Sequence, residues 1–105
     1  MKYYLRKHGS YGSTVDYINE YANENSLAVT YAYIGNRIIA ILGKVMVRAN
    51  DCVAIKEERV SNTYTFHRGF PERKVIKENK VYRPRIIENT RMIVGIIDVY
   101  SISMC

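Results

Sequence analysis

The spacing of apolar side chains predicts one helix near the start of the chain. Apolar residues recur every three or four positions, at Val15, Ile18 and Ala22. This is the period of an α-helix with one buried face. Ser13 or Thr14 stands just before the run, and either side chain can cap the first turn. We therefore expect a helix that begins after one of these two residues and ends near Asn25.

Alternating and continuous β-branched runs predict strands over much of the remaining chain. A first strand is expected at Lys2–Arg6, ended by a loop that contains Gly9 and Gly12. A second is expected at Leu27–Ile34. Further strands are expected at 53–60, 63–67, 85–87 and 91–104, with turns at 50–51, 61–62 and 88–90, and the last two strands are expected to form a closing hairpin.

The return strand at Arg37–Arg48 is expected at the centre of the sheet. It is apolar on both faces as far as Leu42, and both faces must therefore be covered. Gly35 and Asn36 precede it and form a two-residue hairpin turn, whose first position requires a positive φ. The pattern changes at Gly43, which predicts a bulge or bend there.

The segment 71–80 leaves two structures open. Pro71 can be the first residue of a second helix that carries Val75 and Ile76. The same residues can also form a hairpin that turns at Glu78-Asn79. Local chemistry does not choose between these two structures.

A similarity between two segments of the chain favours the helix. The stretch "YIGNRIIAILGKVMV" from Tyr33 resembles "IIENTRMIVGIIDVYS" from Ile86, and placing Arg37 on Arg91 aligns Ile39 with Ile93 and Val45 with Val99. This would make the chain two βαββ repeats, 1–52 and 53–105, related by pseudo-twofold symmetry with a groove between them. The expected fold is thus one α+β domain over 1–105, mainly an antiparallel sheet with one or two helices.

Composition agrees with a β-rich globular protein. There are 13 Ile and 10 Val but only 3 Leu among the 105 residues, and 10 Tyr are present. The longest apolar run, 38–42, is too short to cross a bilayer, and the N-terminus lacks the continuous apolar stretch of a signal peptide. Two cysteines, Cys52 and Cys105, cannot form a disulfide framework, which favours an intracellular location. Cys105 leaves open an intermolecular disulfide.

The sequence offers no enzyme signature, and no cofactor or metal is expected. His8 and His67 have no partner at a metal-ligand spacing, and Cys52 is far in sequence from both. Residues 51–60 resemble the metal-binding Asp strand of PD-(D/E)xK nucleases. That family also needs an acidic-x-Lys triplet on the next strand, and 63–67 contains neither an acid nor a lysine. We therefore expect a protein that acts by binding.

Charge indicates nucleic acid as the first candidate partner. The net charge is +6, and between residues 68 and 91 there are eight Lys/Arg and three Glu. Such a density of cations can follow a phosphate backbone, and exposed aromatic rings beside it can stack on bases. The candidate contacts are the cations Arg68, Arg73, Lys74, Lys77, Lys80, Arg83 and Arg85 with the rings Tyr64, Phe66 and Tyr82. In a helix, Arg73, Lys77 and Lys80 would share one face.

A protein or peptide is the alternative partner. Ten tyrosines exceed what a small core needs, and tyrosine is frequent in interfaces. The closing strand ends in "DVYSISM", which is apolar and little charged. At a sheet edge, it would invite strand addition from another chain or a homodimer. The groove expected between the two repeated halves is the other possible binding surface for a protein partner.

The overall composition resembles that of small proteins from viruses that infect hyperthermophilic archaea. The chain has no Gln or Trp, more Arg than Lys, and abundant Ile and Tyr. The resemblance implies a DNA-binding or host-interaction factor in the host cytoplasm, in a group where duplicated motifs occur. The eight Asn residues, which are thermolabile, leave an AT-rich bacterial phage or plasmid open as the source.

Overall fold

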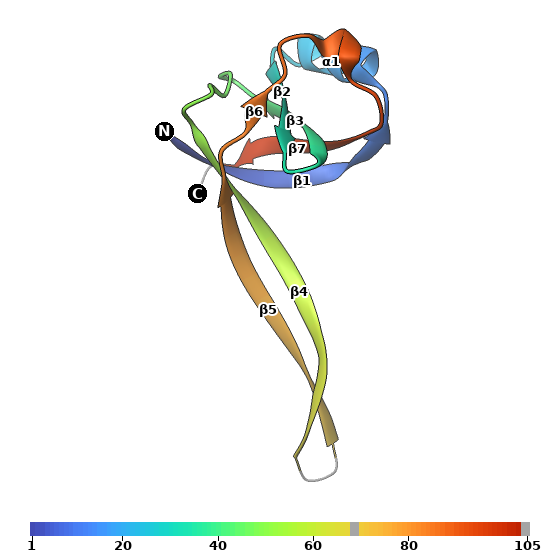
Figure 1. The fold of residues 1–105 in the computed structure, drawn as a ribbon, viewed down its shortest axis with the longest axis vertical. Coiled ribbons are helices and arrows are strands. Elements are labelled where there is room, and N and C mark those ends of the chain that lie inside the picture. The colour runs from blue at the N-terminus through green and yellow to red at the C-terminus, as the bar shows by residue number, and fades with distance from the viewer. Residues whose placement is uncertain (68–69, 104–105) are drawn as a thin grey trace.

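The computed structural model describes residues 1–67 and 70–103, with side chains for 1–56 and 79–103. One seven-stranded sheet and one α-helix account for most of them (Figure 1). The elements are β1 (Lys2–Gly12), α1 (Val15–Glu24), β2 (Ala28–Ile34), β3 (Arg37–Gly43), β4 (Cys52–His67), β5 (Phe70–Tyr82), β6 (Arg85–Ile86), the 3₁₀ turn η1 (Thr90–Met92) and β7 (Ile96–Ser103).

The sheet is mixed, with the strand order β5-β4-β1-β7-β3-β2-β6. β1 pairs in parallel with β4, and β3 pairs in parallel with β7, while the other four pairings are antiparallel. The α+β expectation therefore holds with one helix, and the sheet includes two parallel pairings besides the antiparallel ones.

The sheet curls until its two edges come near each other. β5 and β6 are at opposite ends of the strand order, yet only residues 83 and 84 connect them. The apolar cluster on the inner side takes side chains from every strand of the sheet. It consists of Leu5, Ala32, Ile34, Ile39, Ile41, Val53 and Tyr100, with Val47 from the loop after β3 and with Tyr3, Ile55, Tyr82, Ile86 and Ile102 at its margin.

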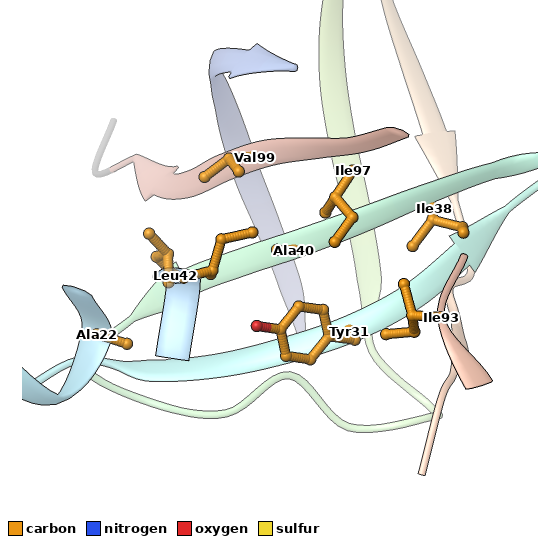
Figure 2. Packing of buried hydrophobic residues seen from close by; sticks show 9 residues of the cluster. Ala22, Tyr31, Ile38, Ala40, Leu42, Ile93, Ile97 and Val99 are labelled. Atoms are coloured by element: carbon orange, nitrogen blue, oxygen red, sulfur yellow. The ribbon is translucent and has the colours of Figure 1, made fainter. Parts of the chain in front are cut away.

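A second cluster lies on the opposite side, which we call the helix side (Figure 2). Ile18 and Ala22 of α1 pack there on side chains from β2, β3 and β7, among them Tyr31, Ala40 and Ile97. Because β3 contributes to both clusters, both of its faces are buried, and it lies in the sheet between β7 and β2. These findings confirm the central position predicted for this strand.

The predicted helix and the predicted hairpin turn at Gly35 are both confirmed. The helix spans 15–24, and Gly35 begins the β2–β3 turn with φ +58°. The predicted cap is only partly right, since Thr14 takes the N-cap position but its hydroxyl makes no capping hydrogen bond. Ser13 instead binds the chain before β7: its N–H and Oγ donate to the Gly95 carbonyl at 2.8 and 3.0 Å.

Two predicted boundaries were wrong. The first strand continues to Gly12 instead of ending at Arg6, because its pairing with β7 extends across both glycines. The return strand stops at Gly43 instead of Arg48, and 44–51 form a loop that places Val47 against the inner cluster. Gly43 thus marks the end of the strand.

The segment 71–80 is neither a helix nor a hairpin. It belongs to β5, which pairs antiparallel with β4 from Val53↔Tyr82 to His67↔Phe70. The turn predicted at 61–62 is instead an irregularity within the long strand β4, between Ser61 and Thr65. β4 and β5 extend from the rest of the molecule as a two-stranded arm (Figure 1), which fits the radius of gyration of 16.9 Å against about 13 Å for a compact chain of this length.

The predicted closing hairpin does not form. β6 pairs with β2, and η1 separates it from β7. β7 lies between β1 and β3, so it is a central strand and not the edge strand that partner binding would need. With a strand in place of the second helix, the βαββ duplication is not confirmed. The two echoed segments do contribute neighbouring strands, β3 and β7, which pair in parallel.

Substituting Gly43 tests how tightly β3 packs on the C-terminal strand. A Cβ at this position would contact Ile102 Cδ1 and lie 3.0 Å from Ile102 Cγ1. We expect Gly43→Ala to lower the free energy of unfolding by about 1–2 kcal/mol, because a well-packed site resists added volume. Urea denaturation measures the effect. Gly12→Ala, with no atom within 4 Å of its Cβ, should change it by less than about 0.5 kcal/mol.

A double-mutant cycle would identify Ile102 as the cause. Ile102→Val removes Cδ1, so the additional cost of Gly43→Ala should be smaller in that background. An unchanged cost in the Ile102→Val background would contradict this explanation.

Candidate functional site

The helix leaves a cleft between itself and β1. Its volume is about 390 Å³. Its walls are Tyr17 and Tyr21 from α1 and Tyr11 from β1, and its polar end is formed by His8 and Ser101. We call these five residues the tyrosine cleft. The floor is apolar and consists of Ile18, Leu27, Leu42 and Val99.

The three rings stay exposed although they are large. Tyr17 is 61% exposed, Tyr21 46% and Tyr11 44%. Tyr17 and Tyr21 are four residues apart and therefore project from the same flank of α1. The sequence places both rings beside the apolar stripe formed by Val15, Ile18 and Ala22. It gave no sign that Tyr11, then predicted to lie in a loop, would face them.

A β-bulge places His8 and Tyr11 on the helix side. Lys7 pairs with Tyr100 and Gly9 with Val99, so His8 is an extra residue in β1. The extra residue shifts the in-and-out alternation of the strand by one position. Tyr11 therefore faces the same side as Tyr4 and Arg6, and without the bulge it would face the inner side.

The bulge also satisfies a buried carboxylate on the inner side. Ser10 Oγ donates to Asp98 Oδ1 at 2.6 Å, and Lys7 Nζ lies 3.8 Å from the same oxygen. Asp98 is only 8% exposed, so these partners offset the cost of its burial.

His8 and Ser101 form the polar contact of the cleft. His8 Nε2 lies 2.6 Å from Ser101 Oγ, at hydrogen-bond distance. Among the described residues that line the cleft there is no carboxylate to orient the imidazole. Both side chains can form hydrogen bonds to a ligand in the cleft.

A basic surface continues from the cleft along the same side of the sheet. Arg6 pairs with Ser101 across the β1–β7 ladder, so it lies directly beside the polar end of the cleft. Arg6, Tyr4 and Lys56 line a neighbouring hollow of about 780 Å³. Lys2 Nζ lies 5.5 Å from the centre of the Tyr4 ring. We call Lys2, Tyr4, Arg6 and Lys56 the basic strand face.

Charge is unevenly distributed between the arm and the rest of the chain. Residues 57–78 carry five Lys/Arg and four Glu, a net +1, and the remaining residues carry eleven Lys/Arg and six Asp/Glu, a net +5. Asp51, near Lys2, accepts from the Arg48 N–H at 2.7 Å, and its Oδ1 lies 3.3 Å from the N-terminal ammonium. The Arg48 hydrogen bond and then this ammonium lower the pKa of Asp51. Most of the excess positive charge thus lies outside residues 57–78, the outer part of the arm.

The cations predicted as contacts do not form one face. Arg68 lies outside the described residues. Arg73, Lys74, Lys77, Tyr64 and Phe66 occupy arm strands whose side chains are not described. A strand alternates with a period of two, so positions 74 and 80 fall on one side and position 77 on the other. The shared helical face predicted for Arg73, Lys77 and Lys80 was wrong.

The remaining predicted residues have separate environments. Lys80 and Tyr82 line a hollow on the inner side together with Arg37. Arg83 is exposed in the link after β5. Arg85 lies over the Tyr33 ring, 5.4 Å from its centre, a cation–π contact at the β6 edge.

Neither a metal site nor a membrane span was found in the described part of the chain. No group of three or more His, Cys, Asp or Glu side chains there could hold a metal ion. No helix in residues 1–67 and 70–103 is long and apolar enough to cross a membrane. Cys52 is a free, half-buried thiol, and Cys105 lies outside the described residues.

Comparison of the chain with protein-family models, with curated proteins and with solved structures gives no match in any of the three.

Tyr31 holds the helix wall of the cleft in place. Its hydroxyl lies 2.8 Å from Asn19 Oδ1 and 3.2 Å from the Val15 carbonyl, both on α1. Burial, and secondarily the Asp16 carboxylate, raise the pKa of Tyr31 to about 12. The neutral phenol is thus favoured in the folded protein.

Replacing Tyr31 by Phe should lower the free energy of unfolding by about 1 kcal/mol at neutral pH, the usual net value of one hydrogen bond. A raised pKa stabilises the fold fully below about pH 10, the unfolded value, and this contribution is lost as the pH rises towards 12. The advantage of the wild type over Tyr31→Phe should therefore shrink between pH 10 and 12. Urea denaturation over this range measures it, and a constant difference would contradict the assignment.

Proposed function

We propose that the protein binds single-stranded nucleic acid on the helix side of its sheet, acting by binding and not by catalysis. One observation carries the proposal. The part of this side that α1 does not cover combines exposed Tyr4 and Tyr11 with the cations of the basic strand face, and no carboxylate is present among the described residues that line its two hollows.

The arrangement suits a single strand better than a duplex. Aromatic rings can stack only on bases whose faces are free, and the cations between the rings can contact the intervening phosphates. Along β1, Tyr4, Arg6 and Tyr11 alternate in this way on one side of the sheet. A duplex would present phosphates but keep its base faces stacked internally.

The acidic helix limits where the phosphates can lie. Asp16, Glu20 and Glu24 are exposed on α1, and residues 13–30 contain no Lys or Arg. A phosphate chain over α1 would face like charges, whereas over β1 and β4 it faces Arg6 and Lys56. The strand should therefore run along the basic strand face and beside the helix.

The arm supplies a second proposed contact region. Arg73, Lys74 and Lys77 lie on β5, and Arg83 follows it, so a strand bound at Lys56 could continue along the arm. The outer part of the arm, residues 57–78, has a net charge of only +1, and we assign it the lesser part of the binding.

Binding should depend steeply on salt. We expect four phosphate contacts to cost roughly 50-fold in affinity between 50 and 200 mM salt. The double variant Arg6→Ala/Lys56→Ala should weaken binding and reduce the slope of log K against log salt by roughly 1.4, about 0.7 per phosphate. Fluorescence anisotropy with a labelled oligodeoxythymidine measures both.

Two comparison variants make the result specific. Lys44→Ala removes an exposed charge in the loop after β3 and should leave the slope unchanged. The triple variant Lys74→Ala/Lys77→Ala/Arg83→Ala should reduce the slope less than the double variant does. Absence of binding at 50 mM salt would reject the proposed function, and a larger loss in the triple variant would place the main contacts on the arm instead.

Self-association through β5 is a second candidate function, and the free edge of this strand favours it. β5 is the last strand of the sheet and 13 residues long, and no strand of the described chain pairs with its outer side. Exposed edges of this length readily accept another strand, and an isolated two-stranded ribbon is only marginally stable.

The sequence of β5 is complementary to itself in charge. If two copies pair antiparallel with Ile76 opposite Ile76, position 74 meets position 78, and position 72 meets position 80. These positions hold Lys74 and Glu78, and Glu72 and Lys80, so each register pair has opposite charges. Phe70 then stands opposite Tyr82. We propose a homodimer in this register.

Charge reversal can test the register. Lys74→Glu alone and Glu78→Lys alone each place like charges opposite one another twice, so each variant should be monomeric. An equimolar mixture of the two restores both attractive pairs and should form a heterodimer. Size-exclusion chromatography with light scattering distinguishes these states, and Lys44→Glu serves as the charge control. A monomeric wild type, or two single variants that still dimerise, would contradict the homodimer.

A further inference from the structure

We infer that the tyrosine cleft receives a single base of the bound strand, turned away from its neighbours and stacked among Tyr11, Tyr17 and Tyr21. This inference rests on the proposed function and adds to it a site that holds one base, beside the phosphate contacts.

The dimensions and walls of the cleft fit a planar aromatic ligand. Its volume of about 390 Å³ is at the small end of the range for small-molecule sites. Rings from two different elements, α1 and β1, bound it, and all three are at least 44% exposed. Exposed rings of this kind gain contact area when a base stacks on them, without a change in the core.

The polar end can bind the edge of a base. Ser101 Oγ can both donate and accept, and His8 offers a ring nitrogen in addition to the one at 2.6 Å from the serine. Enzymes and binding proteins that take up a turned-out base combine such hydrogen bonds with aromatic stacking. The apolar floor, formed in part by Leu42 and Val99, excludes phosphate from the deeper part of the cleft.

The neighbouring charges determine which part of a nucleotide enters. Arg6 is the register partner of Ser101, so a phosphate bound by Arg6 is adjacent to the polar end of the cleft. Glu20 and Glu24 do not line the cleft but are exposed on α1, where they repel phosphate. The phosphate thus stays over β1 while the base points towards α1. Because the backbone cannot cross the helix, the cleft holds one base and not a continuous stack.

Strands that lack one base can distinguish binding at this site from binding through the phosphate contacts. The probes are a short oligodeoxythymidine and the same strand with one abasic nucleotide, placed in turn at each position. We expect one position, or one end, at which loss of the base weakens wild-type binding by roughly five- to 100-fold, the usual effect of one stacked base. Abasic nucleotides elsewhere should have smaller effects.

Variants of Tyr17 then test whether the rings of the cleft cause the loss of affinity at the sensitive abasic position. Tyr17→Ala should weaken binding of the complete strand by a similar factor and leave binding of the sensitive abasic strand unchanged. Tyr17→Phe keeps the ring and should bind like the wild type. Tyr17 is 61% exposed, so its truncation should preserve the fold, which circular dichroism would verify.

The possible outcomes separate the inference from the proposed function. If the complete strand binds at low salt but no abasic position matters, the base site is refuted and the phosphate-binding surface stands. The inference also fails if Tyr17→Ala weakens the complete and abasic strands equally, because the ring would then act through the fold or the backbone. If no strand binds at low salt, both proposals fail.

Discussion

The pairing of β1 with β7 is the interaction on which the rest of the structure depends. It extends from Tyr4↔Ser103 to Gly12↔Ile96, and β1 also pairs with the start of β4. One strand therefore joins the curled sheet to the base of the arm. The bulge at His8 lies within this ladder and allows both ends of β1 to pair correctly. It lets Ser10 reach Asp98 on the inner side and Tyr11 face the helix on the other, so the same local irregularity satisfies a buried carboxylate and completes the cleft.

Local patterns in the sequence predicted the structure correctly where it depends on residues close to one another in the chain. The helix follows from the spacing of Val15, Ile18 and Ala22, and the β2–β3 turn follows from Gly35. The predictions were wrong where strand pairing between residues far apart in the chain determines the structure. Gly9 and Gly12 are typical of loops, yet β7 supplies pairing partners that keep both in a strand. Pro71 is typical of the first turn of a helix, yet it lies in β5 opposite Phe66 of β4.

The sequence predicted cations at 68–91 beside the rings of Tyr64, Phe66 and Tyr82. The surface used in the proposed function also combines rings with cations, but it lies in a different place from that segment. The reason is physical. Charge density along the sequence locates a surface only when the segment forms one face, and a strand divides its cations between two sides. The basic strand face joins Arg6 to Lys56, fifty residues apart, through the parallel pairing of β1 with β4.

The position of α1 determines how much of the sheet remains free for a ligand, and two contacts fix it. Ser13 binds Gly95 before the first turn, and Tyr31 binds the helix at Val15 and Asn19 from the strand beneath. Both contacts join the N-terminal half of the helix to strands of the core. The wall formed by Tyr17 and Tyr21 is therefore in place before any ligand arrives. Binding then does not require the loss of conformational entropy that ordering the wall would cost. In the proposed complex, the aromatic wall on an acidic helix and the basic strand opposite it orient the nucleotide by two independent means. Stacking draws the base towards α1, while charge keeps the phosphate over β1.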